Sequence, residues 1–282
     1  MFGFRSVIKS QVHRSLVAAD NALGVQSGEH PDGWGVAYYI DGAPHITRSP
    51  ATAVSDQLFH RVSGVVSSET VLAHVRKATK GDITVLNCHP FQYGRWVFAH
   101  NGDIENFTEK RDELRAHIAP RLRRFILGDT DSEVVFYLFL SHLSAFAQLS
   151  ERISIDQVNA ALRTTVSLVR EICDTDPSVK PALLTLLVTD GHLMGAVHGG
   201  KDLFWSTYKQ KCGDRDECPN LSPECEAPTQ SGFVNHLVLS SEPLDGENVW
   251  IPLEPGEMVG VDRKMQLVRT KLDQRDLQVV TQ

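Results

Sequence analysis

The sequence predicts an α+β fold in which strands come first, a block of helices follows, and strands return near the end. Three observations support this order. Short strand-like apolar segments dominate the first hundred residues, helix-start signals cluster between residues 106 and 157, and apolar strand-like segments resume after Pro177. With 282 residues, 41% of them hydrophobic and 22% charged, the chain can bury a substantial core.

The first third of the chain predicts one helix among several strands. After a short first strand, Val12, Leu16, Ala19 and Leu23 recur at helical spacing, which predicts an amphipathic helix over residues 11–23. Strands are expected over residues 34–40, 71–75 and 96–100, from their runs of β-branched, aromatic and other apolar residues.

The middle of the chain carries three capping boxes, in which a capping side chain stands three residues before a Glu or Gln. These predict helices near residues 107–117, 131–148 and 155–173. The pairs are Asn106 with Glu109, Thr130 with Glu133, and Ser154 with Gln157.

The last third predicts strands over residues 183–189, 193–198, 237–240 and 258–261. Asp190-Gly191 between the first two is a hairpin signal. No internal repeat or linker is evident, so we expect residues 1–282 to form a single domain.

Composition and charge exclude several classes of protein. A net charge of -7 and a pI near 5.9 disfavour nucleic-acid and anionic-membrane partners, because both reward basic patches. The basic cluster at residues 121–124 is interpreted as a solvated helix face. Charged residues interrupt the first twenty positions, so this segment lacks the apolar core of a signal peptide. The longest apolar runs, at 134–140 and 182–188, are too short to span a bilayer. Five Cys, an odd number, indicate reduced thiols and a cytoplasmic protein.

A polar insertion at about residues 209–232 holds Cys212, Cys218 and Cys225. Three thiols, with His236 as a fourth ligand, suggest zinc, but gaps of five and six residues do not match the short CxxC pairs of structural zinc sites. We therefore interpret the insertion as a surface loop and expect no metal and no cofactor.

Chemistry-bearing residues cluster between residues 74 and 133. An Asn next to a Gly, as at Asn101-Gly102, can aim a side-chain amide and a backbone N–H at an oxygen that gains negative charge. An Arg and an Asp from other segments, Arg76 and Asp131, can hold a substrate that carries a carboxylate and an ammonium. A free amino acid is such a substrate.

At these residues the chain resembles the class II glutamine amidotransferases, N-terminal-nucleophile hydrolases that release ammonia from glutamine, and in particular their small stand-alone members. Five matching segments occur in family order. They are His30-Pro31-Asp32-Gly33-Trp34-Gly35-Val36-Ala37-Tyr38-Tyr39, His74-Val75-Arg76-Lys77-Ala78-Thr79-Lys80-Gly81, Asn87-Cys88-His89-Pro90-Phe91, His100-Asn101-Gly102-Asp103-Ile104-Glu105-Asn106, and Gly128-Asp129-Thr130-Asp131-Ser132-Glu133. The resemblance sharpens the fold to a four-layer αββα sandwich, with two antiparallel sheets between helical layers.

The resemblance also implies roles for individual residues. Asn101 and Gly102 would stabilise the oxyanion, Arg76 would hold the substrate carboxylate, and Asp131 would hold its ammonium. Each role has a structural rival: Arg76 can be a surface arginine, Asp131 can simply complement the macrodipole in the first turn of a helix, and Asn101-Gly102 can be a type I′ turn.

Three further residues of the matching segments are candidates for supporting roles. They are His89, His74 and Thr79. For the two histidines the rival interpretation is a structural hydrogen bond.

One departure from the family concerns the nucleophile, which is a Cys directly after the initiator Met. This chain begins Met1-Phe2-Gly3-Phe4 and has no Cys before Cys88. Relatives open like Met-Cys-Arg-Leu-Phe-Gly-Phe, so we hypothesise a Cys two positions before Met1 in an N-terminally extended form. Cys88 is not expected to replace it, because in an extended segment its side chain and that of His89 point to opposite faces.

The predicted function is therefore hydrolysis of glutamine or a γ-glutamyl amide through a Cys acyl-enzyme in the extended form. The form that begins at Met1 is predicted to be inactive. The ammonia would pass to a partner synthase, or the enzyme would simply cleave γ-glutamyl compounds. Two other hypotheses stay open: an inactive glutamine-binding or regulatory subunit, and an amidase for a different acyl group.

Overall fold

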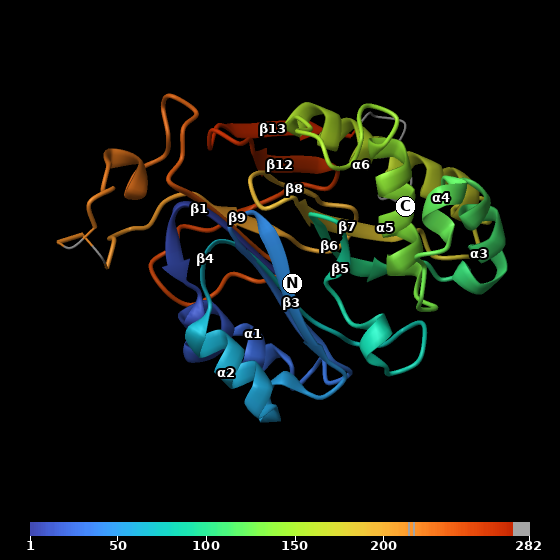
Figure 1. The fold of residues 1–282 in the computed structure, drawn as a ribbon, viewed down its shortest axis with the longest axis horizontal. Coiled ribbons are helices and arrows are strands. Elements are labelled where there is room, and N and C mark those ends of the chain that lie inside the picture. Colours follow the sequence, from blue (N-terminus) through green and yellow to red (C-terminus); the bar gives the residue numbers. More distant parts are fainter. Residues whose placement is uncertain (214, 217, 273–282) are drawn as a thin grey trace.

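The computed structural model describes residues 1–213, 215–216 and 218–272, and two antiparallel β-sheets form its centre (Figure 1). The first sheet has the strand order β11-β9-β10-β1-β4-β2-β3, and the second has the order β13-β12-β8-β7-β6-β5. The strands of the first sheet are β1 (Phe2–Gln11), β2 (Trp34–Ile40), β3 (Ala43–Ser49), β4 (Ser67–Val75), β9 (Phe204–Ser206), β10 (His236–Ser240) and β11 (Ile251–Pro252). Those of the second are β5 (Phe91–Tyr93), β6 (Trp96–Asp103), β7 (Leu183–Thr189), β8 (Met194–Val197), β12 (Glu257–Val261) and β13 (Leu267–Lys271).

Helices cover the outer face of each sheet (Figure 1). The first sheet carries α1 (Leu23–Gln26) and α2 (Gln57–Val65). The second carries α3 (Phe107–Ala116), α4 (Pro120–Arg123), α5 (Asp131–Leu143) and α6 (Ile155–Cys173). The predicted αββα sandwich is therefore confirmed.

Three apolar clusters account for the four layers. One joins α1 and α2 to the first sheet, one joins the second sheet to α3–α6, and the third lies between the sheets. Because side chains alternate along a strand, β4 sends Val71, Ala73 and Val75 toward the helices and Leu72 into the layer between the sheets. In β6, Val97 and Ala99 face that same central layer.

Two of the three predicted helix starts carry the expected side-chain cap. Ser154 forms a complete capping box with Gln157, and the Thr130 hydroxyl accepts from the Glu133 N–H at 3.2 Å. Asn106 makes no cap hydrogen bond, because its amide instead donates to the Cys173 carbonyl at 2.9 Å. The helix there forms nonetheless.

The helix expected over residues 11–23 is wrong. Strand β1 continues to Gln11, a π-helical turn occupies Arg14–Ala18, and the chain extends at Ala19 before α1 begins. The cause is a tertiary contact: the Asn21 amide donates to the Pro243 carbonyl and accepts from the Asp245 N–H, which anchors this segment to the distant loop after β10. Helix α5 also ends at Leu143, before the expected residue 148.

The polar insertion lies at one side of the first sheet (Figure 1). It contains a 3₁₀ turn at Pro223–Cys225, and residues 214 and 217 lie outside the described part. All five cysteines are free thiols, and no group of His, Cys, Asp or Glu in the described ranges is arranged to hold a metal ion. No helix among the described residues has both the length and the apolar character needed to cross a membrane.

Candidate active site

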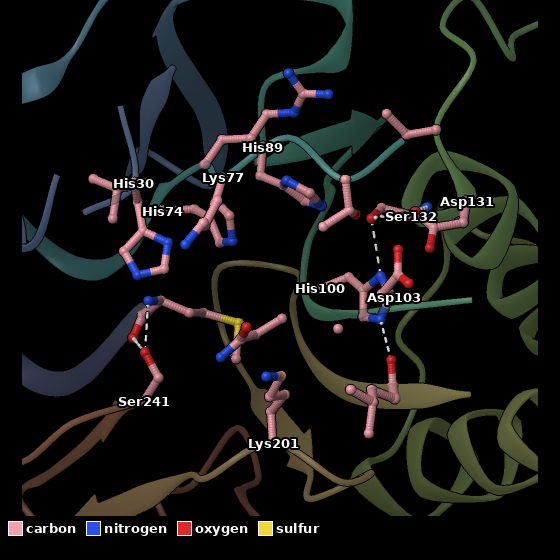
Figure 2. Close-up of a pocket in the computed structure, with 18 of the residues that line it drawn as sticks. His30, His74, Lys77, His89, His100, Asp103, Asp131, Ser132, Lys201 and Ser241 are labelled. Carbon is pink, nitrogen blue, oxygen red and sulfur yellow. Dashed lines mark hydrogen bonds between the residues drawn. The ribbon is translucent and has the colours of Figure 1, made fainter. Parts of the chain in front are cut away.

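A cavity of about 370 Å³ opens where the layer between the two sheets reaches the N-terminal end of α5. Its lining brings together every residue that the sequence singled out as a site residue, although these lie on four separate segments of the chain. They are His74, Arg76, Thr79, His89, Asn101, Gly102 and Asp131. Figure 2 shows His74, His89 and Asp131 around this space.

Strand alternation explains how the polar side chains reach this space. His74 follows Leu72 at a two-residue interval in β4, and Asn101 follows Val97 and Ala99 in β6, so both continue rows that face the central layer. At the ends of these two apolar rows, His74 and Asn101 replace the apolar side chains. The cavity is the polar end of the inter-sheet core.

Arg76 directly follows β4 and is held rigidly. Its Nη2 donates to the carbonyls of Lys80 and Gly81 at 2.8 and 3.2 Å, and its Nη1 donates to that of Asp82 at 3.3 Å. A guanidinium has five N–H donors, so two are left for a ligand. Within the described part of the chain no carboxylate forms an ion pair with this buried cation.

Asp131 is the first residue of α5, where the helix dipole favours a negative charge. Its Oδ2 accepts from the Ile104 N–H at 2.9 Å, and its Oδ1 accepts from the Ser132 N–H at 2.7 Å. The carboxylate is buried, and it too lacks an ion-pair partner among the residues described. Arg76 and Asp131 are therefore a buried cation and a buried anion of the cavity lining that form no ion pair with each other.

His100 and Ser132 support this end of the cavity (Figure 2). The His100 Nε2 lies 2.8 Å from the Leu183 carbonyl, so it must donate, and Nδ1 is then free to accept from the Ser132 hydroxyl at 2.9 Å. The Ser132 hydroxyl also lies 3.2 Å from Asp131 Oδ1. The network fixes the first turn of α5 against β6 and β7.

Asn101 and Gly102 are not a hairpin turn, which corrects that part of the sequence interpretation. Both lie inside β6, where they pair with Thr185 and Leu184 of β7. Gly102 is needed there for close approach: a Cβ at this position would lie 2.6 Å from the Leu183 carbonyl carbon and would also strike the His100 ring. The two residues still line the same cavity as Arg76 and Asp131.

The two candidate histidines form a neutral, buried pair. The rings of His74 and His89 have centroids 4.3 Å apart, and burial lowers the pKa of both well below the ordinary value of 6.5. Both His89 ring nitrogens and the Nδ1 of His74 lack a hydrogen-bond partner in the described structure. They therefore add no positive charge at neutral pH, and their unpartnered nitrogens remain available beside the cavity.

The start of β1 forms another wall. The α-amino nitrogen of Met1 lies 2.9 Å from the Ser241 hydroxyl, and burial lowers its pKa to about 5. His30, Lys77 and Lys201 lie around the same space (Figure 2).

Some cavity residues had no individual role in the sequence analysis. His100 and Ser132 were inside the matching segments, so their positions next to Asn101 and Asp131 were the available signal. Lys201 follows a strand far from any motif and gave no signal.

Cys88 does not line the cavity. Its Sγ lies 3.3 Å from the Thr84 carbonyl and 3.4 Å from that of Ser49, and burial raises the pKa of its thiol. A thiol with a raised pKa is a poor nucleophile.

Comparison with known proteins assigns the family. The sequence pattern of class II glutamine amidotransferases matches residues 11–280. The chain therefore belongs to the class II glutamine amidotransferases.

Individual relatives agree with this assignment. The chain is 36% identical to a probable glutamine amidotransferase, DUG3, of Saccharomyces cerevisiae, over 57% of this chain and about half (49%) of the yeast protein. It is 26% identical to the putative glutamine amidotransferase YafJ of Escherichia coli, over 82% and 85% of the two chains. Over 26% of its length it is 43% identical to a γ-glutamyl-hercynylcysteine sulfoxide hydrolase of Mycobacterium tuberculosis, covering 32% of that protein.

The fold is also shared with a solved structure, a glutamine aminotransferase class-II domain protein from Silicibacter pomeroyi. The TM-score is 0.62 at 23% identity, covering 96% of this chain and 98% of the other. This likeness concerns the fold alone.

Proposed function

We propose that the cavity hydrolyses the γ-amide bond of glutamine or of a γ-glutamyl compound. One observation carries the proposal: Arg76 and Asp131, two buried and oppositely charged groups without ion-pair partners among the described residues, line one cavity with Asn101 and Gly102. Buried charges are costly unless paired, so the site is suited to a ligand that brings one charge of each sign.

An α-amino acid meets this requirement. The two remaining N–H donors of Arg76 suit a carboxylate, and Asp131 suits an ammonium. With both ends of the amino acid held, its side-chain amide extends toward Asn101 and Gly102. There the Asn101 amide and a backbone N–H would stabilise the negative oxygen of a tetrahedral intermediate.

For the nucleophile we propose a Cys two positions before Met1. In the β1–β4 register Phe2 faces Ala73 and Gly3 faces Leu72, so each step back along β1 advances one residue in β4. Two steps before Met1 bring the chain opposite Arg76. A side chain two residues before Met1 would point to the same face of the sheet as that of Met1, which faces the central layer.

The proposed reaction proceeds through a thioester. The Cys α-amino group, with an ordinary pKa of about 7.7–8.0, takes the thiol proton as sulfur attacks the amide carbon. The same proton passes to the departing nitrogen, which leaves as ammonia or an amine. Water then attacks the thioester and releases glutamate and the free thiol.

The fate of the nitrogen separates two versions of this function. The γ-glutamyl hydrolase named among the relatives supports simple cleavage of γ-glutamyl compounds. Relatives named glutamine–fructose-6-phosphate aminotransferase support the release of ammonia to a synthase partner; the match covers 19% of one such protein.

Free thiols throughout the chain support a cytoplasmic location. We also propose that residues 1–282 act as one domain.

A second candidate function is glutamine binding without turnover. The observation in its favour is that no Cys lines the cavity in the described residues.

Three proteins separate the two functions: the chain as written, a form with Met-Cys-Arg placed before Met1, and a control with Met-Ala-Arg there. Glutamate release from glutamine is measured for each, together with glutamine binding by calorimetry. Release from the Cys form alone supports the enzyme. Binding by all three forms with no release supports the binding subunit, and no binding by any form contradicts both.

Replacing Arg76 addresses the third hypothesis, an amidase for another acyl group. If the substrate has an α-carboxylate, Arg76→Ala in the Cys form raises KM for glutamine at least tenfold, because a charged hydrogen bond contributes about 1.5–3 kcal/mol. An unchanged KM would favour a substrate without that carboxylate.

A further inference from the structure

A second polar cavity, of about 400 Å³, lies at the opposite end of the second sheet. It is lined by Arg95, Arg152, His192 and Arg263. These residues come from the β5–β6 turn, the segment between α5 and α6, the β7–β8 turn and the β12–β13 turn. Since β6 has eight residues, roughly 24 Å separate this end of the strand from the end that carries Asn101 and Gly102.

The turns are fixed by one buried carboxylate, that of Asp190. Its Oδ1 accepts from the N–H groups of His192 and Leu193 at 3.0 and 3.1 Å. Its Oδ2 pairs with Arg263 and lies 3.8 Å from Arg95 Nε. Asp190 is fully buried, whereas Arg95 and Arg263 each keep about a quarter of their side chains exposed (24% and 25%). The negative charge is therefore inside, and the cavity presents the guanidinium groups.

The charges around the cavity do not balance. Three guanidinium groups face one carboxylate, and burial lowers the pKa of His192, whose ring is therefore neutral at neutral pH. The Nε atoms of Arg95 and Arg263 are buried and lack a hydrogen-bond partner in the described structure. Arg152 is exposed and forms no ion pair within the described ranges. Two positive charges and several N–H donors are left over.

Neighbouring acidic and basic groups do not remove this excess. Asp262, in the β12–β13 turn, accepts from the N–H groups of Lys264 and Gln266, and Glu151 accepts from that of Gln148. Neither acid lines the cavity. Arg5, on the adjacent β1, pairs with Glu69.

We propose that this cavity binds a small phosphate-type oxyanion carrying two or more negative charges, such as pyrophosphate or a phosphate monoester. Guanidinium groups match the geometry of phosphate oxygens and bind them with paired hydrogen bonds. The proposed ligand supplies the missing negative charge and acceptors for the terminal N–H groups of the partly exposed guanidinium groups. The inference does not depend on the proposed function of the first cavity.

The test is calorimetric titration with inorganic phosphate, pyrophosphate and citrate at constant ionic strength. Arg152→Gln is the main variant, because this exposed side chain has no structural bond to lose. Arg121→Gln, an exposed arginine of α4, is the matched control. We expect pyrophosphate to bind at one site, about tenfold more weakly in Arg152→Gln and within twofold of the parent in Arg121→Gln.

Three results would overturn the proposal. They are the absence of binding by phosphate and pyrophosphate at millimolar concentration, equal binding by both variants, and citrate binding as tightly as pyrophosphate. The last would mean that the cavity selects charge rather than phosphate. Arg263→Lys, which keeps the charge near Asp190 but loses the planar fork, should weaken pyrophosphate binding while glutamine binding at the first cavity stays unchanged.

Discussion

Replacing Gly102 by Ala tests whether the close contact between β6 and β7 builds the candidate active site. A methyl group at this position would lie 2.6 Å from the Leu183 carbonyl carbon, closer than side-chain carbons approach backbone atoms. It would also strike the His100 ring, whose Nε2 donates to the same Leu183 carbonyl at 2.8 Å. The two strands must separate at this point, and the hydrogen bond is lost.

The expected cost follows from these two effects. Overpacking costs about 1–3 kcal/mol, and loss of a hydrogen bond costs about 0.5–1.5 kcal/mol, so Gly102→Ala should lower the free energy of unfolding by roughly 2–4 kcal/mol. Urea denaturation followed by circular dichroism measures this change. Separation of the strands would also displace Asn101, so glutamine turnover by the Cys form should fall even where the protein remains folded.

Gly64 supplies the matched control. It lies in α2, and a Cβ there has no atom within 4 Å. Gly64→Ala should therefore stabilise the protein by up to about 1 kcal/mol, because Ala is the better helix former. If Gly102→Ala were as stable as the parent protein, the argument from close approach would be refuted.

Three further substitutions test the caps, the buried histidines and the network beside Asp131. Ser154→Ala removes the capping box between Ser154 and Gln157, so it should lower the free energy of unfolding by about 1 kcal/mol in urea denaturation. An unchanged midpoint would mean that the capping box contributes nothing to stability. Burial holds the pKa of His89 well below 6.5. The contribution of this neutral histidine to stability is therefore complete above pH 6.5, and it falls at lower pH because the unfolded chain then binds a proton that the folded protein does not. His89→Asn should reduce the slope of stability against pH, between pH 6.5 and 5, by up to about 1.4 kcal/mol per unit; an equal slope in both proteins would contradict the assignment of a neutral histidine. Ser132→Ala removes the hydroxyl between His100 and Asp131, and should weaken glutamine binding about two- to tenfold by calorimetry, whereas unchanged binding would show that the hydroxyl is not needed.

The sequence predicted those elements whose signals are local. The strands at Trp34–Ile40 and Leu183–Thr189 have the predicted bounds, and Asp190-Gly191 forms the predicted hairpin, with Gly191 at a φ of +90°. The helix at Ile155–Cys173 also matches, because its capping box acts within three residues. The region of residues 11–23 did not follow its helical periodicity, since the contacts of Asn21 with a loop more than two hundred residues away override it.

The candidate site shows the same division between local and distant effects. Motifs identified Arg76, Asn101, Gly102 and Asp131, and the structure brings all four to one cavity. Their local geometry was not predictable: Asn-Gly is a strong turn signal, yet pairing with β7 keeps both residues in a strand. Nor does any local pattern predict that Lys201 joins the cavity.

The most direct test of the account is a comparison of L-glutamine with glutaramic acid, which keeps the carboxylate and the amide but lacks the ammonium. Calorimetry measures the affinity of both ligands for the parent protein and for Asp131→Asn. A general structural effect of the substitution weakens both ligands equally and cancels in the ratio of their affinities. We predict that the parent protein prefers L-glutamine at least tenfold and that Asp131→Asn loses this preference. An equal preference in both proteins would contradict the claim that Asp131 holds the substrate ammonium opposite Arg76.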